Sequence, residues 1–160
     1  MIRVRVITVS DRSHRGERED RTGPALAAVA AELPAEVVSV TVVPDERAQI
    51  AAAIRSAAAE ADLVLTAGGT GLGHRDVTPE ATRDVIEREA PGFGEEMRRR
   101  SAEVTDRAIV SRATAGSLGR AFVVNLPGSP KGAVECLSFL RAPLLHAVDL
   151  LTSDVTDCAQ

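Results

Sequence analysis

The sequence predicts an α/β fold of three layers, in which helices cover both faces of a mostly parallel central sheet. Two observations support this. Short apolar runs with many β-branched residues alternate along the chain with segments whose apolar residues recur at helical spacing. Three such runs are each followed by a loop and then a helix, as in strand–loop–helix units. Right-handed crossovers would bring the loops that follow the strands to one edge of the sheet, where ligands of such folds bind.

In the first half of the chain, the pattern predicts strands at residues 4–9, 36–43 and 63–66 and helices at residues 22–33 and 47–61. Residues 10–22 are polar and irregular, which indicates a loop. Thr22 is expected to cap the first helix, with Pro24 in its first turn, and Pro34 to end it. Asp45 lies in the turn before the second helix, where a capping carboxylate is the default interpretation.

In the second half, strand-like patterns at 109–114 and 120–124 are expected to flank a hairpin turn at 115–119. Thr78 is expected to cap a helix that has Pro79 in its first turn and that Pro91-Gly92 stops, and a short further helix is expected over 94–100. Helical spacing returns after Pro130 and continues to Leu151.

Length and composition describe one globular domain spanning residues 1–160. A net charge of −4 and an aromatic content of 2% argue against a nucleic-acid-binding chain, because stacking platforms and a basic surface are both missing. Cys136 and Cys158 are too few for a zinc site or a disulfide framework. With neither a signal peptide nor an apolar run of about 18 residues, we expect a cytoplasmic protein without a membrane span.

The loop after the third strand, residues 66–73, contains four glycines in six residues. Glycine lets backbone N–H groups approach a phosphate closely, so the loop favours anion binding. It matches neither common phosphate motif: the Rossmann spacing fails, and His74 and Arg75 stand where a Walker A loop needs Lys and Ser/Thr. A flexible turn is the alternative interpretation.

Two carboxylates follow separate strands. If the loops converge, Asp45 and Asp76 face one another and can hold a Mg²⁺ ion against a triphosphate. That arrangement suits nucleotidyl transfer. The alternative for each is a helix-capping acid without a catalytic role.

Two further loops offer polar groups at the same edge. Ser10 and Asp11 follow the first strand directly. Residues 125–131 run from a strand through a turn to a helix start, with Ser129 as its cap and Pro130 in its first turn. The new helix would offer free N–H groups to an anion, although a well-capped turn is equally consistent with this segment.

These loops together resemble the molybdenum-cofactor biosynthesis proteins of the MogA and MoaB type, which include the G domain of gephyrin. The matching segments are SDRSHRGEREDRTGPAL, VPDE, LTAGGTGLGHRDVTPEAT, PGFGEEMR and NLPGSPKGAVECL, in the expected order. The resemblance implies a three-layer α/β fold and assembly as trimers or larger homo-oligomers. It also implies Mg²⁺-dependent transfer of AMP from ATP to the terminal phosphate of molybdopterin, with release of pyrophosphate.

Carried over residue by residue, the resemblance makes Asp45 and Asp76 the catalytic and Mg²⁺-binding aspartates. The expected substrate-binding residues are Ser10, Asp11, Gly68, Gly69, Thr70, Gly71, Thr78, Glu80, Asn125, Pro127, Gly128 and Ser129. Ala67 stands where the family often has Thr or Ser, and the short C-terminal segment resembles the MoaB branch. Two hypotheses therefore stay open: an adenylyltransferase, which the two intact aspartates favour, and a non-catalytic molybdopterin-binding or protein-interaction module.

Overall fold

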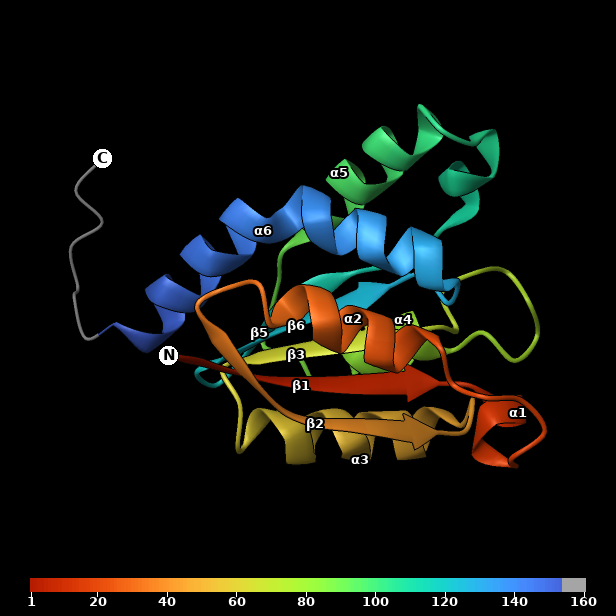
Figure 1. The fold of residues 1–160 in the computed structure, drawn as a ribbon, viewed down its shortest axis with the longest axis horizontal. Coiled ribbons are helices and arrows are strands. Elements are labelled where there is room, and N and C mark those ends of the chain that lie inside the picture. The colour runs from red at the N-terminus through yellow and green to blue at the C-terminus, as the bar shows by residue number, and fades with distance from the viewer. Residues whose placement is uncertain (154–160) are drawn as a thin grey trace.

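A computed structural model describes residues 1–153 and shows a six-stranded sheet in the order β2-β1-β3-β6-β5-β4 (Figure 1). The strands are β1 (Ile2–Val9), β2 (Ala35–Val43), β3 (Leu63–Ala67), β4 (Arg88–Glu89), β5 (Ala115–Leu118) and β6 (Ala121–Leu126). Strands β2, β1, β3 and β6 run parallel to one another, whereas β5 is antiparallel to β6 and β4 is antiparallel to β5. The predicted mostly parallel sheet is confirmed.

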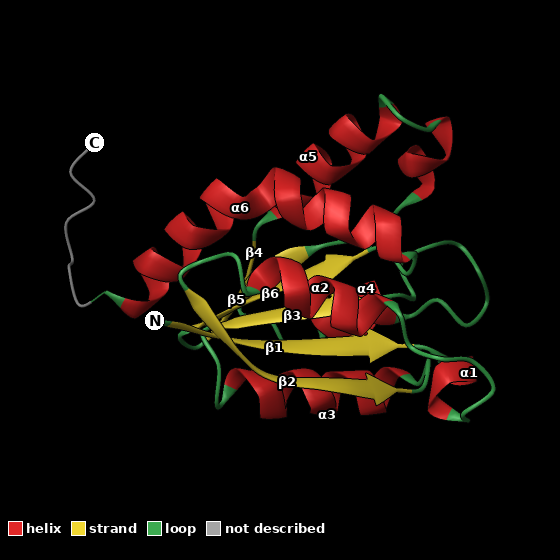
Figure 2. Cartoon of the chain, viewed as in Figure 1, coloured by secondary structure: helices red, strands yellow, loops and turns green. Residues whose placement is uncertain are grey.

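Helices cover both faces of this sheet (Figure 2). Helices α3 (Arg47–Ala58) and α4 (Thr78–Arg83) pack on one face, and α2 (Thr22–Ala30), α5 (Pro91–Ala102) and α6 (Pro130–Thr152) pack on the other. The short helix α1 (Asp11–His14) and the 3₁₀ helix η1 (Asp106–Val110) complete the elements. The three predicted layers are therefore present.

Side chains that point alternately to the two faces of the sheet form two hydrophobic cores, one on each face. In β1, Val4 and Val6 contribute to the core beneath α2 and α6, while Ile7 and Val9 contribute to the core beneath α3. All four are at most 4% exposed. A strand buried on both faces is a continuous apolar run, which is why it is recognisable in the sequence.

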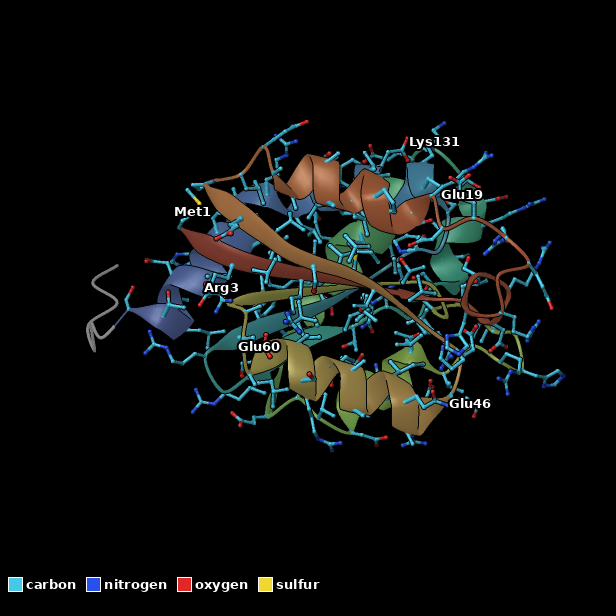
Figure 3. All side chains as sticks on the ribbon, turned by 60° about the horizontal axis from the view of Figure 1, so that its bottom comes forward. Met1, Arg3, Glu19, Glu46, Glu60 and Lys131 are labelled. Carbon is cyan, nitrogen blue, oxygen red and sulfur yellow. The ribbon has the colours of Figure 1, made fainter. Side chains whose placement is uncertain are left out.

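The parallel strands β1, β2, β3 and β6 all point the same way, so the loops that follow them meet at one edge of the sheet. Figure 3 shows this arrangement: Glu19 and Glu46 lie toward this edge, whereas Met1, Arg3 and Glu60 lie toward the opposite one. The expected convergence of these loops is confirmed.

The predicted helix caps need correction. Thr22 does not cap α2; Asp20 accepts hydrogen bonds from the backbone N–H groups of Thr22 (3.1 Å) and Gly23 (3.0 Å). Thr78 does not cap α4 either, because Val77 occupies the N-cap position and makes no side-chain cap bond. The sequence pattern places a helix cap only to within a residue or two. Which hydroxyl can cap depends on its tertiary contacts, and that of Thr22 bonds to the Gly128 carbonyl instead.

Asp45 is also not a helix cap, because Glu46 occupies the N-cap position of α3. The polar stretch after β1, expected to be a loop, contains the single-turn helix α1. Ser10 caps that helix by accepting the Ser13 N–H at 3.2 Å. Four polar residues carry too little apolar periodicity for a helix to be predicted.

The hairpin is shifted from its expected place. The sequence predicts the turn at residues 115–119, but Ala115–Leu118 is strand β5 and the turn falls at Gly119, whose φ is +57°. The expected strand at 109–114 is wrong, since this segment begins in η1. Pro91 opens α5 rather than ending α4, which stops at Arg83. A proline can follow the end of a helix or stand in the first turn of the next one, so its presence at position 91 does not decide between the two.

Within residues 1–153, no helix is long and apolar enough to cross a membrane. Cys136 is buried in the core beneath α6, and burial raises the pKa of its thiol. The expectation for Cys158 falls outside the described residues.

Candidate functional site

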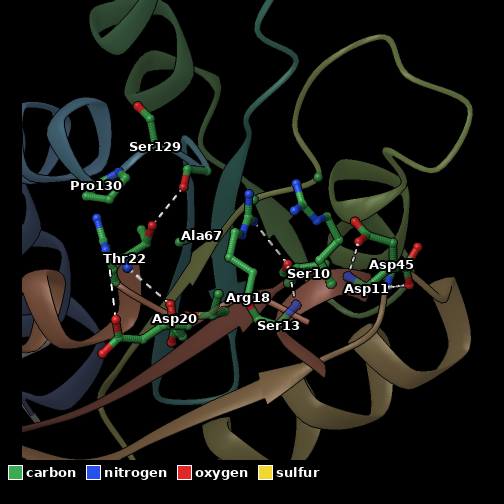
Figure 4. A pocket seen from close by; sticks show the side chains of 18 of the residues that line it. Ser10, Asp11, Ser13, Arg18, Asp20, Thr22, Asp45, Ala67, Ser129 and Pro130 are labelled. Carbon is green, nitrogen blue, oxygen red and sulfur yellow. Dashed lines mark hydrogen bonds and ion pairs between the residues drawn. The ribbon is translucent and has the colours of Figure 1, made fainter. Parts of the chain in front are cut away.

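A cavity of about 810 Å³ opens where the parallel strands end (Figure 4). That volume lies within the range of small-molecule and cofactor sites, about 300–1,000 Å³. Its walls come from the ends of β1 and β3, the segment from α1 to α2, and the loops before α3, α4 and α6. The predicted site residues that line it are Ser10, Asp11, Asp45, Gly68, Gly69, Asp76, Gly128 and Ser129.

Glycines allow two of these loops to approach each other at the cavity floor. Gly68 and Gly69 have φ values of +104° and +67°, in the left-handed region that favours glycine. The Gly68 N–H donates to the carbonyl of Leu126 at 3.1 Å, which joins the end of β3 to the end of β6. A β-carbon on Gly69 would overlap the Thr78 hydroxyl and lie 3.1 Å from an Asp45 carboxylate oxygen. The glycine-rich loop therefore provides space beside Asp45.

Asp11 and Asp45 hold each other in place. The Asp11 N–H donates to the Asp45 carboxylate at 2.9 Å, and the Asp45 N–H donates to the Asp11 carboxylate at 3.0 Å. Arg75 donates to both carboxylate oxygens of Asp11, at 3.0 and 3.2 Å, and to Glu46 at 2.8 Å. Three loops are thereby fastened together by side-chain contacts.

The two aspartates differ in electrostatic environment. The hydrogen bond from Arg75 lowers the pKa of Asp11. Burial raises the pKa of Asp45, and the negative charges of Asp11 and Asp76 raise it further. Asp45 is thus a partly desolvated carboxylate next to two others, and a cation at this place would favour its ionised form.

Asp76 reaches the same cavity from the loop before α4. Its carboxylate accepts the N–H of Gly73 at 2.9 Å. The structure therefore brings Asp45 and Asp76 to one cavity, as the convergence of their loops predicts.

Positive charge enters the cavity from α1 and from the segment between α1 and α2. Arg12, Arg18 and Arg21 line it, and Arg18 donates to the Ser10 hydroxyl at 3.2 Å. Ser129 lines the cavity from the loop before α6, and its hydroxyl caps α6 by accepting the Gly132 N–H at 3.1 Å. The cavity therefore combines carboxylates with guanidinium groups, which suits a ligand that carries both phosphates and a metal ion.

Six predicted substrate-binding residues lie outside this lining. Thr70, Gly71 and Pro127 line a neighbouring cavity of about 290 Å³ beside α5. Thr78 is fully buried, and its hydroxyl has no hydrogen-bond partner within the described chain. Glu80 pairs with Arg112.

Asn125, the sixth, is fully buried near the end of β6. Its amide donates to the hydroxyls of Thr66 at 2.9 Å and Thr82 at 2.8 Å, and its oxygen accepts the Thr114 N–H at 3.3 Å. This network joins β3, β6, α4 and the start of β5. Asn125 therefore supports these elements rather than lining the cavity.

Asp20 and Thr22 line the cavity and are not among the predicted site residues. Asp20 also accepts the Thr8 hydroxyl at 2.8 Å, and Thr22 donates its hydroxyl to the Gly128 carbonyl at 2.8 Å. These bonds tie the start of α2 to β1 and to the loop before α6. A signal for them exists in the sequence, because the segment that contains them follows a buried strand, as the other site loops do.

Within residues 1–153, no group of three or more His, Cys, Asp or Glu side chains is arranged to hold a metal by itself. A Mg²⁺ ion commonly binds through one or two carboxylates together with substrate phosphates. Asp45 and Asp76 fit that mode of binding, in which the substrate supplies part of the ligand set.

Residues 5–147 match the family described as "Probable molybdopterin binding domain". The chain belongs to this molybdopterin-binding family. Members of the family share both sequence and fold with it. The chain is 40% identical over 155 residues to a Helicobacter pylori protein named molybdopterin adenylyltransferase, with 94% of this chain and 88% of the relative covered.

Two more members illustrate the breadth of the match. The Escherichia coli K12 protein of the same name is 40% identical over 145 residues, covering 88% of this chain and 74% of the relative. The crystal structure of the molybdopterin biosynthesis enzyme MoaB from Thermus thermophilus superposes with a TM-score of 0.89 at 48% identity, covering 95% of this chain and 97% of that one. The predicted membership in this family is confirmed.

Proposed function

We propose that this protein is a molybdopterin adenylyltransferase in molybdenum cofactor biosynthesis. The observation that carries the proposal is the placement of Asp45 and Asp76 in one cavity that guanidinium groups also line. Relatives that match nearly the whole chain bear that enzyme's name, which favours the transferase over a non-catalytic module.

The proposed reaction forms one P–O bond and breaks another. An oxygen of the terminal phosphate of molybdopterin attacks the α-phosphorus of ATP and forms a new P–O bond. The bond between the α-phosphorus and its bridging oxygen breaks, and pyrophosphate leaves with the electron pair. Because the attacking phosphate is already an anion, no general base has to remove a proton. Catalysis then depends on positioning and on stabilising negative charge.

Asp45 and Asp76 are the residues that we propose hold Mg²⁺. Their carboxylates supply the hard oxygen ligands that this ion prefers. Burial and the charges of Asp11 and Asp76 raise the pKa of Asp45, and a cation would favour its ionised form. When bound, Mg²⁺ would neutralise charge on the phosphates.

The remaining groups bind and orient the substrates. We assign Arg12, Arg18 and Arg21 to phosphate oxygens, because a guanidinium donates several hydrogen bonds from one plane. Gly68 and Gly69 keep the cavity floor free of side chains, so a phosphate can approach the backbone there. Ser10 and Ser129 add hydroxyl groups from the loops that follow β1 and β6.

The test is a turnover assay with purified protein, molybdopterin, ATP and Mg²⁺, in which adenylylated molybdopterin and pyrophosphate are measured. We expect product from the wild-type protein and none from Asp76→Asn, with molybdopterin binding and the unfolding midpoint close to wild type. Asp84→Asn is the matched control, because Asp84 is an exposed carboxylate paired with Arg47. Tight binding without product in the wild type would identify a non-catalytic binding module instead.

We also propose that the chain forms a homotrimer or a larger homo-oligomer. Val104, Ile109 and Val110 are large apolar side chains that are 50–69% exposed within a stretch of seven residues. Exposed apolar residues that cluster in this way are typical of an interaction surface. Light scattering coupled to size-exclusion chromatography tests this, and a mass of 16.8 kDa would contradict it.

A further inference from the structure

Arg112 lies in the segment between η1 and β5 and is not among the residues that line the cavity. Its guanidinium nevertheless reaches the loop that carries Asp76. The Nε–H donates to the carbonyl of Gly71 at 2.7 Å, and one Nη donates to the carbonyl of Asp76 at 2.7 Å. The guanidinium also forms an ion pair with Glu80 in the first turn of α4. All three nitrogen atoms therefore have partners on the stretch from Gly71 to Glu80.

The backbone of Arg112 adds a further bond, because its N–H donates to the carbonyl of Thr70 at 2.8 Å. Arg112 thus contacts the loop at its start, at Thr70 and Gly71, and at its end, at Asp76. A single side chain that bonds both ends of a loop fixes their separation.

Apart from Arg112, the side-chain contact that holds the loop from outside is that of Arg75, which bonds Asp11 and Glu46 in the loops after β1 and β2. Leu72, the large apolar residue in its middle, is 72% exposed, so it contributes almost no buried area. The backbone N–H of Asp76 and its carboxylate both bond to Gly73, within the loop itself. At the far end, the Thr78 N–H donates to the Gly69 carbonyl at 3.1 Å. The bonds within the loop set its local shape, whereas Arg112 connects that shape to the β5 side of the sheet.

The chemistry of the contact requires arginine. A guanidinium presents donors in one rigid plane, so it can serve two carbonyls and a carboxylate at once. Lysine would keep the positive charge and lose this fork. Burial raises the pKa of Glu80, but the hydrogen bond and charge of Arg112, together with a backbone hydrogen bond and the charge of Arg83, keep that pKa below its usual value.

We infer that Arg112 is a positioning residue for adenylyl transfer, which holds the loop from Gly71 to Asp76 so that the Asp76 carboxylate lies in the cavity with Asp45. This inference rests on the proposed function for its effect on turnover. It also gives Glu80 a role different from substrate binding: Glu80 orients the guanidinium from α4.

The test compares wild type with Arg112→Lys and with Arg99→Lys as a matched control. Arg99 is an exposed arginine whose ion pairs, with Glu96 and Glu103, stay within α5 and the turn that follows it. Hydrogen exchange followed by mass spectrometry reports on the loop without any need for activity. We expect faster exchange in a peptide covering residues 70–77 for Arg112→Lys, and wild-type exchange for the control.

Turnover supplies the second readout. We expect kcat to fall about 10- to 100-fold in Arg112→Lys, because a misplacement of about 1 Å at a reacting site has effects of that size. The KM for ATP should stay within about twofold, since the phosphate-facing arginines are unchanged. Wild-type kcat together with unchanged exchange in residues 70–77 would overturn the inference.

A second variant protects the test against misfolding. Glu80→Gln removes the charge partner and leaves the two carbonyl contacts of Arg112 in place, so it should give a smaller change of the same kind in exchange and in kcat. An unchanged Glu80→Gln protein would contradict the role given to Glu80. If the wild-type protein forms no product, the proposed function fails, and the exchange comparison still decides whether Arg112 holds the loop.

Discussion

Replacement of Asn125 by alanine separates a supporting role from a substrate-binding one. The side chain is fully buried and makes three hydrogen bonds, to Thr66, Thr82 and the backbone of Thr114. A residue with that environment should act on stability first. Activity should fall only to the extent that the neighbouring loops move.

The size of the effect follows from what Asn125→Ala leaves behind. The Thr114 N–H loses its acceptor in a buried place, and an unsatisfied buried donor costs about 1–3 kcal/mol. The two hydrogen bonds to threonine hydroxyls contribute about 0.5–1.5 kcal/mol each, so the sum is about 2–6 kcal/mol. That is a large share of the total stability of a domain, about 5–15 kcal/mol.

Urea unfolding followed by circular dichroism measures this loss. The matched control is Ser138→Ala, which removes an exposed hydroxyl that bonds back to the carbonyl of Val134 within α6, and it should change stability by less than about 0.5 kcal/mol. A loss of less than about 1 kcal/mol in Asn125→Ala would contradict the supporting role of Asn125, because the structure leaves at least the Thr114 N–H without an acceptor in this variant.

Three further predictions concern the loops at the cavity. Gly69→Ala should lower the stability by about 1–3 kcal/mol because of the strained backbone, and should lower kcat because the new methyl group displaces Asp45. Gly119→Ala is the control: Gly119 also has a positive φ but has no neighbour within 4 Å, so this variant should lower stability alone. Chelation of divalent ions should abolish turnover and leave the melting temperature unchanged, and added Mg²⁺ should restore the activity. Glu80→Gln should be less stable than wild type at pH 7. This difference in stability should shrink as the pH falls below about 4.3, because a carboxyl with a lowered folded-state pKa loses its stabilising contribution as it is protonated. A difference that stays constant from pH 7 to pH 3 would contradict the ion pair with Arg112.

Much of the fold is accessible from the sequence because it depends on periodicity. The buried strands β1, β3 and β6 are continuous apolar runs, and α3 shows its inner face as Ile50, Ile54 and Ala57. The edge is harder to predict. Strand β5 is Ala115–Leu118, whose small residues give no strong strand signal, and strand β4 has only two residues. These elements are determined by pairing with their neighbours in the sheet rather than by their own composition.

The candidate site also has a part that the sequence predicts and a part that it does not. Asp45 and the glycines closely follow strands, and Asp76 lies in the loop that joins β3 to α4, so topology brings them to one edge of the sheet and one cavity. The structure instead buries Asn125 in a hydroxyl network and pairs Glu80 with Arg112, which lies 32 positions away in the chain. Contacts of that kind depend on where two distant segments meet, and residue type and spacing carry no record of it.

The central claim is that AMP passes from ATP to molybdopterin at this cavity. The most direct measurement uses ATP labelled with ³²P at the α-phosphorus, incubated with molybdopterin, Mg²⁺ and the wild-type protein. We expect the label to appear in molybdopterin and unlabelled pyrophosphate to be released in equal amount, with neither formed by Asp76→Asn. Release of orthophosphate with all of the label retained in ADP would contradict this claim, because the bond broken would then lie between the β- and γ-phosphates.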